Sequence, residues 1–527
     1  MNRASTLALM LFIFAGAAQS KDLIGVFEDA LHNDPVIRQA DANRLAAREA
    51  KPQALSALLP QLNGTASGTR EHASGFQSQI FEVAPSNPTC TANPTLPQCQ
   101  PQLTVAKTAD QIDNTIQQWA LNLRQNVFSW SNWMALKAAS AQVAEAEATY
   151  QAAEQQLILR VAQAYFTVLS ADDTLQADQA ALEAISRQLD QANKRFEVGL
   201  IAITDVEDAK AARDTAAAAV IADKRTLATA ENQLQEITGQ KYDRLAKPGA
   251  DMPLLNPEPA NAERWVDTPL EQNPTLVSSR LAADVARDNV RIAQGGHLPT
   301  LDLVAGRSYN YTSSDQVFDG TPFANVDSKT NDRQIGLQFT LPIYSGGLVQ
   351  SKVRQAQYQW IAAKEGVVQS SRATERQARD AYLGVISGIA RVQALRQALE
   401  SNQTALRATE AGYEVGTRTS VDVLNARRNL VQAQTNYAVS RYDYIVSVLT
   451  LRLAAGTLDR PELTQINGWL TTTEPTSPAV PTPENLAPTV PPGQGAPPPM
   501  NPPPQPLQPP PGTPPPSNTP PPARGRR

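Results

Sequence analysis

The sequence has few of the residues that build most catalytic centres, because it contains only three histidines and two cysteines. The histidines, His32, His72 and His297, are far apart along the chain, so a metal site or a hydrolase site built on histidine is not expected. Charged residues make up 18% of the chain and the formal net charge is -5, a balance without the clustered basic face that nucleic-acid binding requires. The sequence also lacks a glycine-rich phosphate loop and a nucleophile motif. We therefore predict no enzyme activity, no cofactor, no metal and no nucleic-acid partner.

Long hydrophobic runs are also missing after Ser20. No stretch there reaches the roughly eighteen apolar residues that a membrane-spanning helix needs. The first twenty residues instead have the pattern of a secretory signal peptide, with Arg3, an apolar stretch at 7–16 and small residues before Lys21. No cysteine lies near this cleavage site, so a lipid-anchored N-terminus is not indicated. We predict a signal peptide at 1–20.

Aromatic residues make up only 6% of the chain, and glycine and proline are absent from several long segments. Segment 131–198 contains neither, and its apolar residues recur three and four positions apart, which predicts a helix on the order of 100 Å long. Segments 204–238 and 420–455 are likewise free of glycine and proline, whereas the three glycines of segment 348–411 favour an interruption. Helices this long cannot bury themselves, so we expect side-by-side coiled coils, with packing across subunits.

The sequence repeats itself, and this repeat organises the chain. Motifs of the first half recur in the same order in the second half, first 239 and later 217 residues further on, so the first half carries 22 extra residues. We predict a first repeat at 21–250 and a second at 251–470, each with the order helix, strand pair, very long helix, helix. The paired motifs are Asn33-Asp34-Pro35 with Gln272-Asn273-Pro274, Leu59-Pro60 with Leu298-Pro299, and Phe196-Glu197-Val198-Gly199 with Tyr413-Glu414-Val415-Gly416.

Between the predicted helices, four segments alternate between apolar and polar residues. One apolar and one polar face is the pattern of membrane-barrel strands, although for any one strand alone a half-buried position in a soluble sheet is the better interpretation. Four strands cannot close a barrel of useful bore, whereas three chains with four strands each would make twelve. Closure thus predicts a trimer. The segments are 62–70, 119–127, 301–311 and 335–343.

Two features lie outside this pattern. Cys90 and Cys99 share a Pro/Thr/Asn-rich stretch within the extra residues of the first half. An exported chain meets an oxidising compartment, so we expect a disulfide that closes a surface loop, with two free thiols as the alternative. At 471–527, 57 residues contain 23 of the 41 prolines. Because proline has no amide donor, these residues are predicted to form an extended, disordered tail.

Over about residues 22–459, these motifs together resemble the TolC family of outer-membrane efflux ducts. The likeness is closer to the protein after which the family is named than to its lipidated multidrug-efflux members, in keeping with the absent N-terminal cysteine. The resemblance implies a trimer whose 12-stranded β-barrel lies in the outer membrane and continues into a 12-helix α-barrel that projects through the periplasm. The motifs that carry it are Arg-Phe-Glu-Val-Gly-Leu at 195–200, Gly-Tyr-Glu-Val-Gly-Thr-Arg at 412–418, Gly-His-Leu-Pro at 296–299 and Leu-Pro-Ile-Tyr-Ser-Gly-Gly at 341–347.

The resemblance implies a gate at the periplasmic tip, where hydrogen bonds and an ion pair hold the inner coiled coil against the outer one. The matching residues are Thr204 and Asp205 in the first repeat and Tyr413 and Arg418 in the second. Arg418 offers a forked donor to the Asp205 carboxylate, and the Tyr413 hydroxyl can add a hydrogen bond. A few surface contacts of about 1 kcal/mol or less each would make a latch that a partner can open.

The resemblance also implies a constriction and a docking surface at this tip. Asp422 matches a ring of carboxylates, but a second acidic position is Asn425 here, so we expect weaker block by divalent cations. From the residues alone, Asp422 is an acid near a helix N-terminus. The two glycine-containing turns would receive the adaptor, and from the residues alone they are helix connections. These turns are Val198-Gly199-Leu200 and Val415-Gly416-Thr417.

The implied partners are two further copies of the chain, a periplasmic membrane-fusion adaptor, an inner-membrane pump of RND or ABC type, and outer-membrane lipid. The implied function is a passive exit duct for tripartite drug efflux, type I protein secretion or both. A passive duct leaves the choice of cargo to the pump, so the sequence does not distinguish drugs from proteins. The alternative is a periplasmic coiled-coil spacer or adaptor, which explains the long helices but not the four alternating segments.

Overall fold

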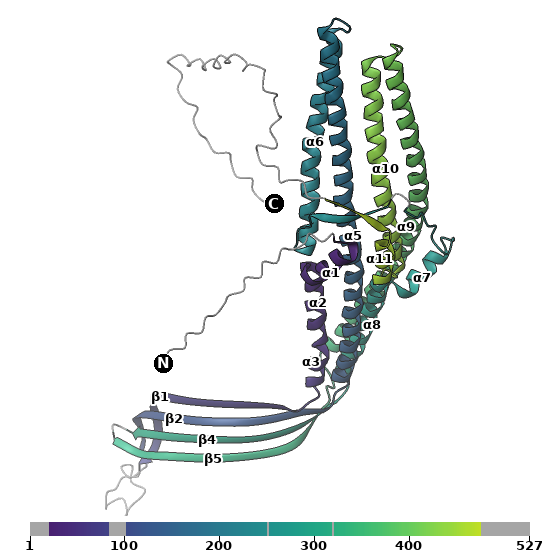
Figure 1. Ribbon diagram of the computed structural model, residues 1–527. Helices are drawn as coiled ribbons and strands as arrows, with labels where there is room; N and C mark the ends of the chain where they lie inside the picture. Colours follow the sequence, from purple (N-terminus) through teal and green to yellow (C-terminus); the bar gives the residue numbers. More distant parts are fainter. Residues whose placement is uncertain (1–20, 84–101, 250–251, 319–320, 476–527) are drawn as a thin grey trace, which may run out of the picture. The chain divides into compact units, whose positions relative to one another are not determined.

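A computed structural model describes residues 21–83, 102–249, 252–318 and 321–475 (Figure 1). The chain divides into two units, 1–480 and 481–527, and every described residue belongs to the first. The predicted signal peptide at 1–20, both cysteines and residues 476–527 of the predicted tail lie outside the described residues.

Two very long helices dominate the described unit. Helix α5 (Trp130–Glu197) has 68 residues and α9 (Leu348–Glu414) has 67. Each is followed by a short turn and a helix of 36 residues, α6 (Ile203–Thr238) or α10 (Ser420–Ala455), which packs back against it. The helix predicted at 131–198 is thereby confirmed. Within the described ranges, no helix combines the length and the apolar character needed to cross a membrane.

The glycines of α9 do not interrupt it, so the predicted break is wrong. A side chain at Gly366 or Gly384 would meet open space, whereas one at Gly388 would lie 3.8 Å from the Cα atom of Tyr444 in α10. Each glycine weakens a helix by about 1 kcal/mol relative to alanine. Packing of α9 along α10 and α8 opposes that cost and keeps the helix continuous.

The repeated Asn-Asp-Pro and Gln-Asn-Pro motifs begin equivalent helices in the two halves. Asp34 caps α2 by accepting a hydrogen bond from the amide of Ile37, and Asn273 caps α8 by accepting from the amides of Thr275 and Leu276. The proline that follows each cap has a fixed φ that suits the first helical position. The shorter helices are α1 (Leu23–Asn33), α2 (Pro35–Arg48), α3 (Ala50–Ser56), α7 (Arg264–Gln272), α8 (Pro274–Gln294), the 3-10 turn η2 (Gly295–His297) and α11 (Arg460–Asn467).

Four antiparallel strands form one sheet in the order β1-β2-β4-β5. All four predicted segments overlap these strands, but the strands are much longer than predicted. Strand β5 ends before the predicted residues 341–343, because Pro342 has no amide to donate to a ladder. The strands are β1 (Gln61–Val83), β2 (Gln102–Phe128), β4 (Thr300–Phe318) and β5 (Thr321–Thr340).

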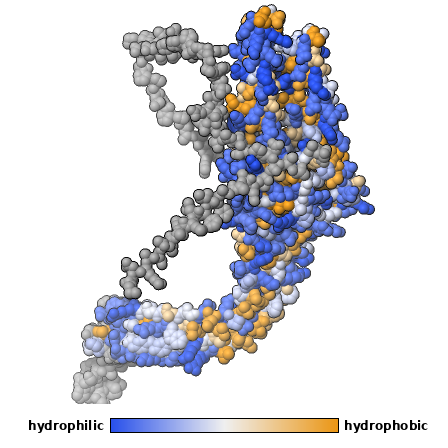
Figure 2. Space-filling model, in the orientation of Figure 1, coloured by the Kyte–Doolittle hydropathy of each residue, from blue (hydrophilic) through white to orange (hydrophobic). Residues whose placement is uncertain are grey.

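The register gives this sheet one apolar and one polar face. Leu62, Leu123, Ala305 and Ile335 lie opposite one another across all four strands. The next row, on the other face, consists of Asn63, Asn122, Gly306 and Gln334. Figure 2 shows hydrophobic residues gathered on the part of the sheet nearest the helices.

A second, small sheet was not predicted. Strand β3 (Arg244–Pro248) pairs antiparallel with β6 (Leu470–Pro475), so the first residues assigned to the proline-rich tail belong to the folded unit. The predicted start of the tail at 471 was wrong. It was based on the proline content of residues 471–527 and took no account of the three consecutive threonines at 471–473, a residue type that favours strands.

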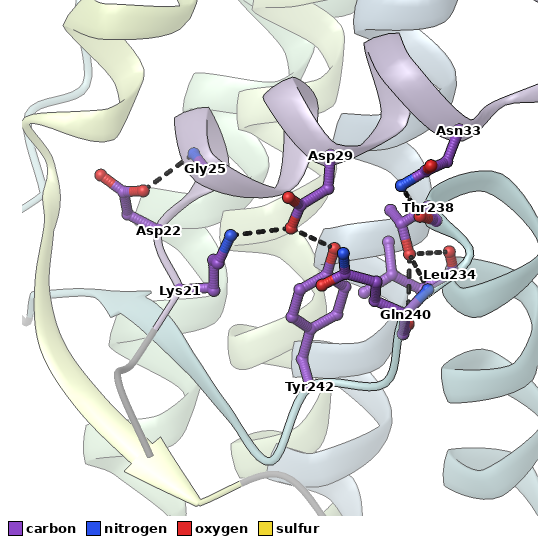
Figure 3. A network of polar contacts seen from close by, with 9 residues as sticks. All are labelled: Lys21, Asp22, Gly25, Asp29, Asn33, Leu234, Thr238, Gln240 and Tyr242. Atoms are coloured by element: carbon purple, nitrogen blue, oxygen red, sulfur yellow. Dashed lines mark hydrogen bonds and ion pairs between the residues drawn. The ribbon is translucent and has the colours of Figure 1, made fainter. Parts of the chain in front are cut away.

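The main core lies where this small sheet meets α1, α5, α6 and α10, and it includes the buried side chains of Tyr165 and Tyr444. A polar network fastens the first described residues to the end of α6 (Figure 3). Both Lys21 Nζ, at 2.8 Å, and the Tyr242 hydroxyl, at 2.9 Å, donate to Asp29 Oδ2. Asn33 Nδ2 donates to the carbonyl of Thr238 at 2.9 Å. Helix α1 is thus held against the base of the first long hairpin.

Candidate functional site at the two helical turns

The turns that follow α5 and α9 have the same backbone geometry. Gly199 and Gly416 adopt φ angles of 76° and 78°, a left-handed conformation that glycine adopts at little cost. In each turn, the glycine amide donates to the carbonyl three residues back, and the next amide donates to the carbonyl five residues back. This hydrogen-bond pattern ends a helix and reverses the chain within a few residues.

Both turns leave apolar side chains in solvent. Val198 and Leu200 are 69% and 72% exposed, and Val415 is 75% exposed. Thr417 takes the place of leucine in the second turn, and its hydroxyl donates to the carbonyl of Gly412 at 3.0 Å. The first turn therefore presents two apolar side chains and the second presents one.

The four predicted latch residues all lie at these turns. Thr204 and Asp205 are in the first turn of α6, Tyr413 is in the last turn of α9, and Arg418 lies between α9 and α10. Within the residues described for a single chain, no ion pair joins Asp205 to Arg418. The aliphatic part of Arg418 instead folds over Gly412, where an added Cβ would lie 2.8 Å from Arg418 Cγ. Gly412 is the first residue of the 412–418 motif, but the sequence did not reveal that it makes room for the Arg418 side chain.

One contact at the tips joins the two hairpins directly. The guanidinium carbon of Arg195, near the end of α5, lies 5.1 Å from the ring centroid of Tyr413, near the end of α9. A guanidinium within about 6 Å of an aromatic ring is attracted by the ring quadrupole. Sequence reasoning assigned no role to Arg195, because nothing local indicates a partner more than two hundred residues away.

Asp422 of the predicted constriction belongs to a capping box. Its Oδ2 accepts hydrogen bonds from the amide and the hydroxyl of Thr419, both at 2.9 Å, and its own amide donates to the Thr419 hydroxyl. The hydrogen bond from the Thr419 amide, followed by that from its hydroxyl, lowers the pKa of the Asp422 carboxyl. The Thr-x-x-Asp spacing could have revealed Thr419. In contrast, Ala202, the N-cap residue of α6, offers no side-chain hydrogen bond to the helix, and Asn425 is exposed.

Residues 26–240 and 265–457 match the model of the outer membrane efflux protein family. The chain belongs to this family. It is 36% identical to outer membrane protein TolC of Escherichia coli (strain K12) over 490 residues, which cover 92% of this chain and 91% of TolC. It is 26% identical to the proteases secretion protein PrtF of Dickeya chrysanthemi over 470 residues, 89% of this chain and 95% of PrtF. The predicted membership of the TolC family and the predicted outer-membrane location are confirmed.

Solved structures of other channels share the fold of this outer membrane efflux protein. The CmeC outer membrane channel of Campylobacter jejuni superposes with a TM-score of 0.62 at 19% identity, over 85% of this chain and 89% of CmeC. The outer membrane protein VceC of Vibrio cholerae superposes with a TM-score of 0.61 at 22% identity, over 82% of this chain and 96% of VceC.

Above the core, the two hairpins of this efflux protein carry half-buried charged side chains. Arg427 of α10 pairs with Glu410 of α9 at 2.6 Å. In the first hairpin, burial and a neighbouring carboxyl, Asp178 of α5, raise the pKa of Asp223 in α6 to about 7. Asp178 and Arg427 also line a groove of about 430 Å³ between the hairpins. Among the described residues, no group of three or more His, Cys, Asp or Glu side chains could hold a metal ion.

Proposed function

We propose that three copies of this outer membrane efflux protein assemble into one duct, with a 12-stranded β-barrel in the outer membrane and a 12-helix tunnel through the periplasm. The observation that carries the proposal is the four-stranded sheet, which ends in two long edge strands, β1 and β5. Long edges with unpaired amides and carbonyls favour pairing with another chain. Four strands enclose too little space for a bore, whereas three chains supply twelve.

The two faces of the sheet support a barrel rather than a soluble sheet. Ile335, Leu337 and Phe339 alternate along β5 and are 80%, 68% and 65% exposed in a single chain. An apolar outer face suits lipid, and the row with Asn63 and Gln334 suits an aqueous bore. Outer-membrane lipid is thus the partner of the apolar face.

The helical tips would close this duct. When the three pairs of hairpins meet, Arg418 would pair with Asp205, while Thr204 and the Tyr413 hydroxyl would add hydrogen bonds. The three Asp422 side chains of the trimer would form a ring of carboxylates near this latch. The three Asn425 side chains would form a neutral ring next to it. Each contact is weak in water, which suits a gate that must open reversibly.

The turns would receive a periplasmic adaptor that couples the duct to an inner-membrane pump of RND or ABC type. The exposed apolar side chains at 198–200 and 415–417 provide the contact surface. The matching proteins named for efflux and for protease secretion support both kinds of cargo. The proposed division of the chain is a signal peptide at 1–20, a first repeat at 21–250 and a second repeat at 251–470. The proline-rich tail follows the small sheet.

The proposal is tested by recording currents of the purified, membrane-extracted protein in a planar bilayer, wild type beside Arg418→Ala. A small, steady wild-type current that increases in Arg418→Ala is the expected result, because the substitution removes the latch cation. Arg396→Ala, which removes an exposed arginine from the shaft of α9, is the control and should leave the current unchanged. Folded trimers that carry no current in any variant would exclude the duct and favour a periplasmic spacer.

A further inference from the structure

We propose that Arg195 is part of the closing device, because its guanidinium, placed against the Tyr413 ring, fastens the first hairpin to the second within one chain. This inference rests on the proposed duct and adds a residue to its gate. It also gives Tyr413 a second role, since the ring and the hydroxyl of a tyrosine can serve different partners.

Both residues are held in place by the turns that follow them. The carbonyl of Arg195 accepts the amide of Leu200 at 2.9 Å, and the carbonyl of Tyr413 accepts the amide of Gly416 at 3.1 Å. These hydrogen bonds tie the backbone of each residue to its own turn. A displacement of one hairpin tip relative to the other by more than the Arg195 side chain can follow therefore separates the guanidinium from the ring.

Within the described part of the chain, Arg195 forms no ion pair that would compete with the Tyr413 ring, and its side chain is partly buried. Lys194, the neighbouring cation, is exposed and points elsewhere on the helix, because successive residues of a helix lie about 100° apart. Lys194 thus provides a matched control for the loss of one positive charge in the last turn of α5.

The strength of the contact suits a gate. Removing a partly exposed cation–π contact is expected to change the ratio of open to closed tips by about two- to fivefold. A partner that binds the exposed turns about two- to fivefold more tightly in the open form than in the closed form would offset the contact. The contact therefore biases the tip toward the closed form without locking it.

Planar-bilayer currents of the full-length trimer in KCl test the inference. Arg195→Gln should raise the mean current, whereas Lys194→Gln should not. Tyr413→Leu, which removes ring and hydroxyl, should raise the current more than Tyr413→Phe, which keeps the ring. The double variant Arg195→Gln/Tyr413→Leu should conduct no more than Tyr413→Leu alone, because the two groups act through one contact. Migration of the unheated trimer checks that each variant has assembled.

The outcomes separate this inference from the proposed function. If Arg418→Ala raises the current but Arg195→Gln does not, the gate exists without Arg195 and the inference is wrong. The inference is also wrong if the effects of Arg195→Gln and Tyr413→Leu multiply, or if Tyr413→Phe matches Tyr413→Leu. Assembled trimers that carry no current in any variant would remove the duct, and this gate residue with it.

Discussion

The ammonium group of Lys247 lies 2.7 Å from Oδ2 of Asp172, inside the core of the protein. It also donates to Asp173 at 2.9 Å, and the hydroxyl of Tyr442 donates to the same Asp173 side chain at 2.5 Å. Burial by itself would lower the pKa of Lys247, but the hydrogen bonds and charges of the two aspartates outweigh it and raise the pKa. These contacts join strand β3 to the middle of α5 and to α10, where the long hairpins leave the core.

We expect Lys247→Met to destabilise the protein by about 3 kcal/mol or more, because it leaves two carboxylates near the core without their cation. Thermal unfolding of the detergent-extracted protein, followed by far-UV circular dichroism, measures the loss. Lys210→Met is the control, since that exposed lysine has only a long contact of 3.8 Å to Glu207. Equal stability of the two variants would show that the buried network adds nothing.

The protein should lose stability as the pH rises from about 4 to about 7, in part through Asp223. Burial, reinforced by Asp178, raises the pKa of Asp223 to about 7 in the folded chain, from 3.8 for an unperturbed aspartate. The folded state therefore holds a proton that the unfolded state has released, and this contribution is complete below the lower value and lost above the higher one.

Asp223→Asn removes this dependence. The variant should unfold at a higher temperature than the wild type at pH 8, and the difference should shrink at pH 5, where Asp223 is protonated in the folded chain. Asp208→Asn, an exposed substitution in the same helix, should show no such trend. A difference between Asp223→Asn and wild type that is the same at both pH values would contradict the shifted titration.

Gly295→Ala should prevent correct folding of the junction between the sheet and the helices. An added Cβ would lie 2.3 Å from Ser131 Oγ and 2.9 Å from the Ser131 amide nitrogen, so the backbone of α5 would have to move. Gly366→Ala, which meets open space within α9, should instead stabilise the protein by up to about 1 kcal/mol. The yield of the proposed trimer, measured as the heat-modifiable form in membranes, compares the two, and an equal yield would disprove the close contact.

Asn425→Asp should strengthen block of the proposed duct by divalent cations several-fold, because it adds a second ring of carboxylates next to Asp422. The concentration of Mg²⁺ that halves the bilayer current measures the effect. Asn436→Asp, further along α10, is the matched control for added charge. Unchanged block in Asn425→Asp would place residue 425 away from the narrowest point.

Local features of the fold could be predicted from the sequence. Helices α5, α6 and α10 follow from the absence of glycine and proline in their segments, whereas α9 is continuous despite three glycines. The equivalent helix starts follow from Asp34 and Asn273, because caps act within a single turn. The strands were found where residues alternate, as around Leu337. They were predicted too short in both repeats, and in the first repeat Thr, Gly and Ser in segment 62–70 weaken the alternation.

Contacts between distant segments could not be predicted. Strand β3 pairs with β6 across more than two hundred residues, and neither strand is long enough to show a period. Lys247 and Asp172 belong to different elements, and no spacing rule connects them. The same holds for Arg195 and Tyr413, although both lie in motifs that the family resemblance singled out.

The two turns differ in one respect that affects their dynamics. The N-cap residue of α10, Thr419, takes part in a capping box, whereas the N-cap residue of α6 is Ala202, whose side chain satisfies none of the free amides. The uncapped end frays more readily, so amide hydrogens in the first turn of α6 should exchange with solvent deuterium faster than those of α10. Asp205 lies in that turn, so we expect the backbone around Asp205 to open more often than the backbone around Asp422.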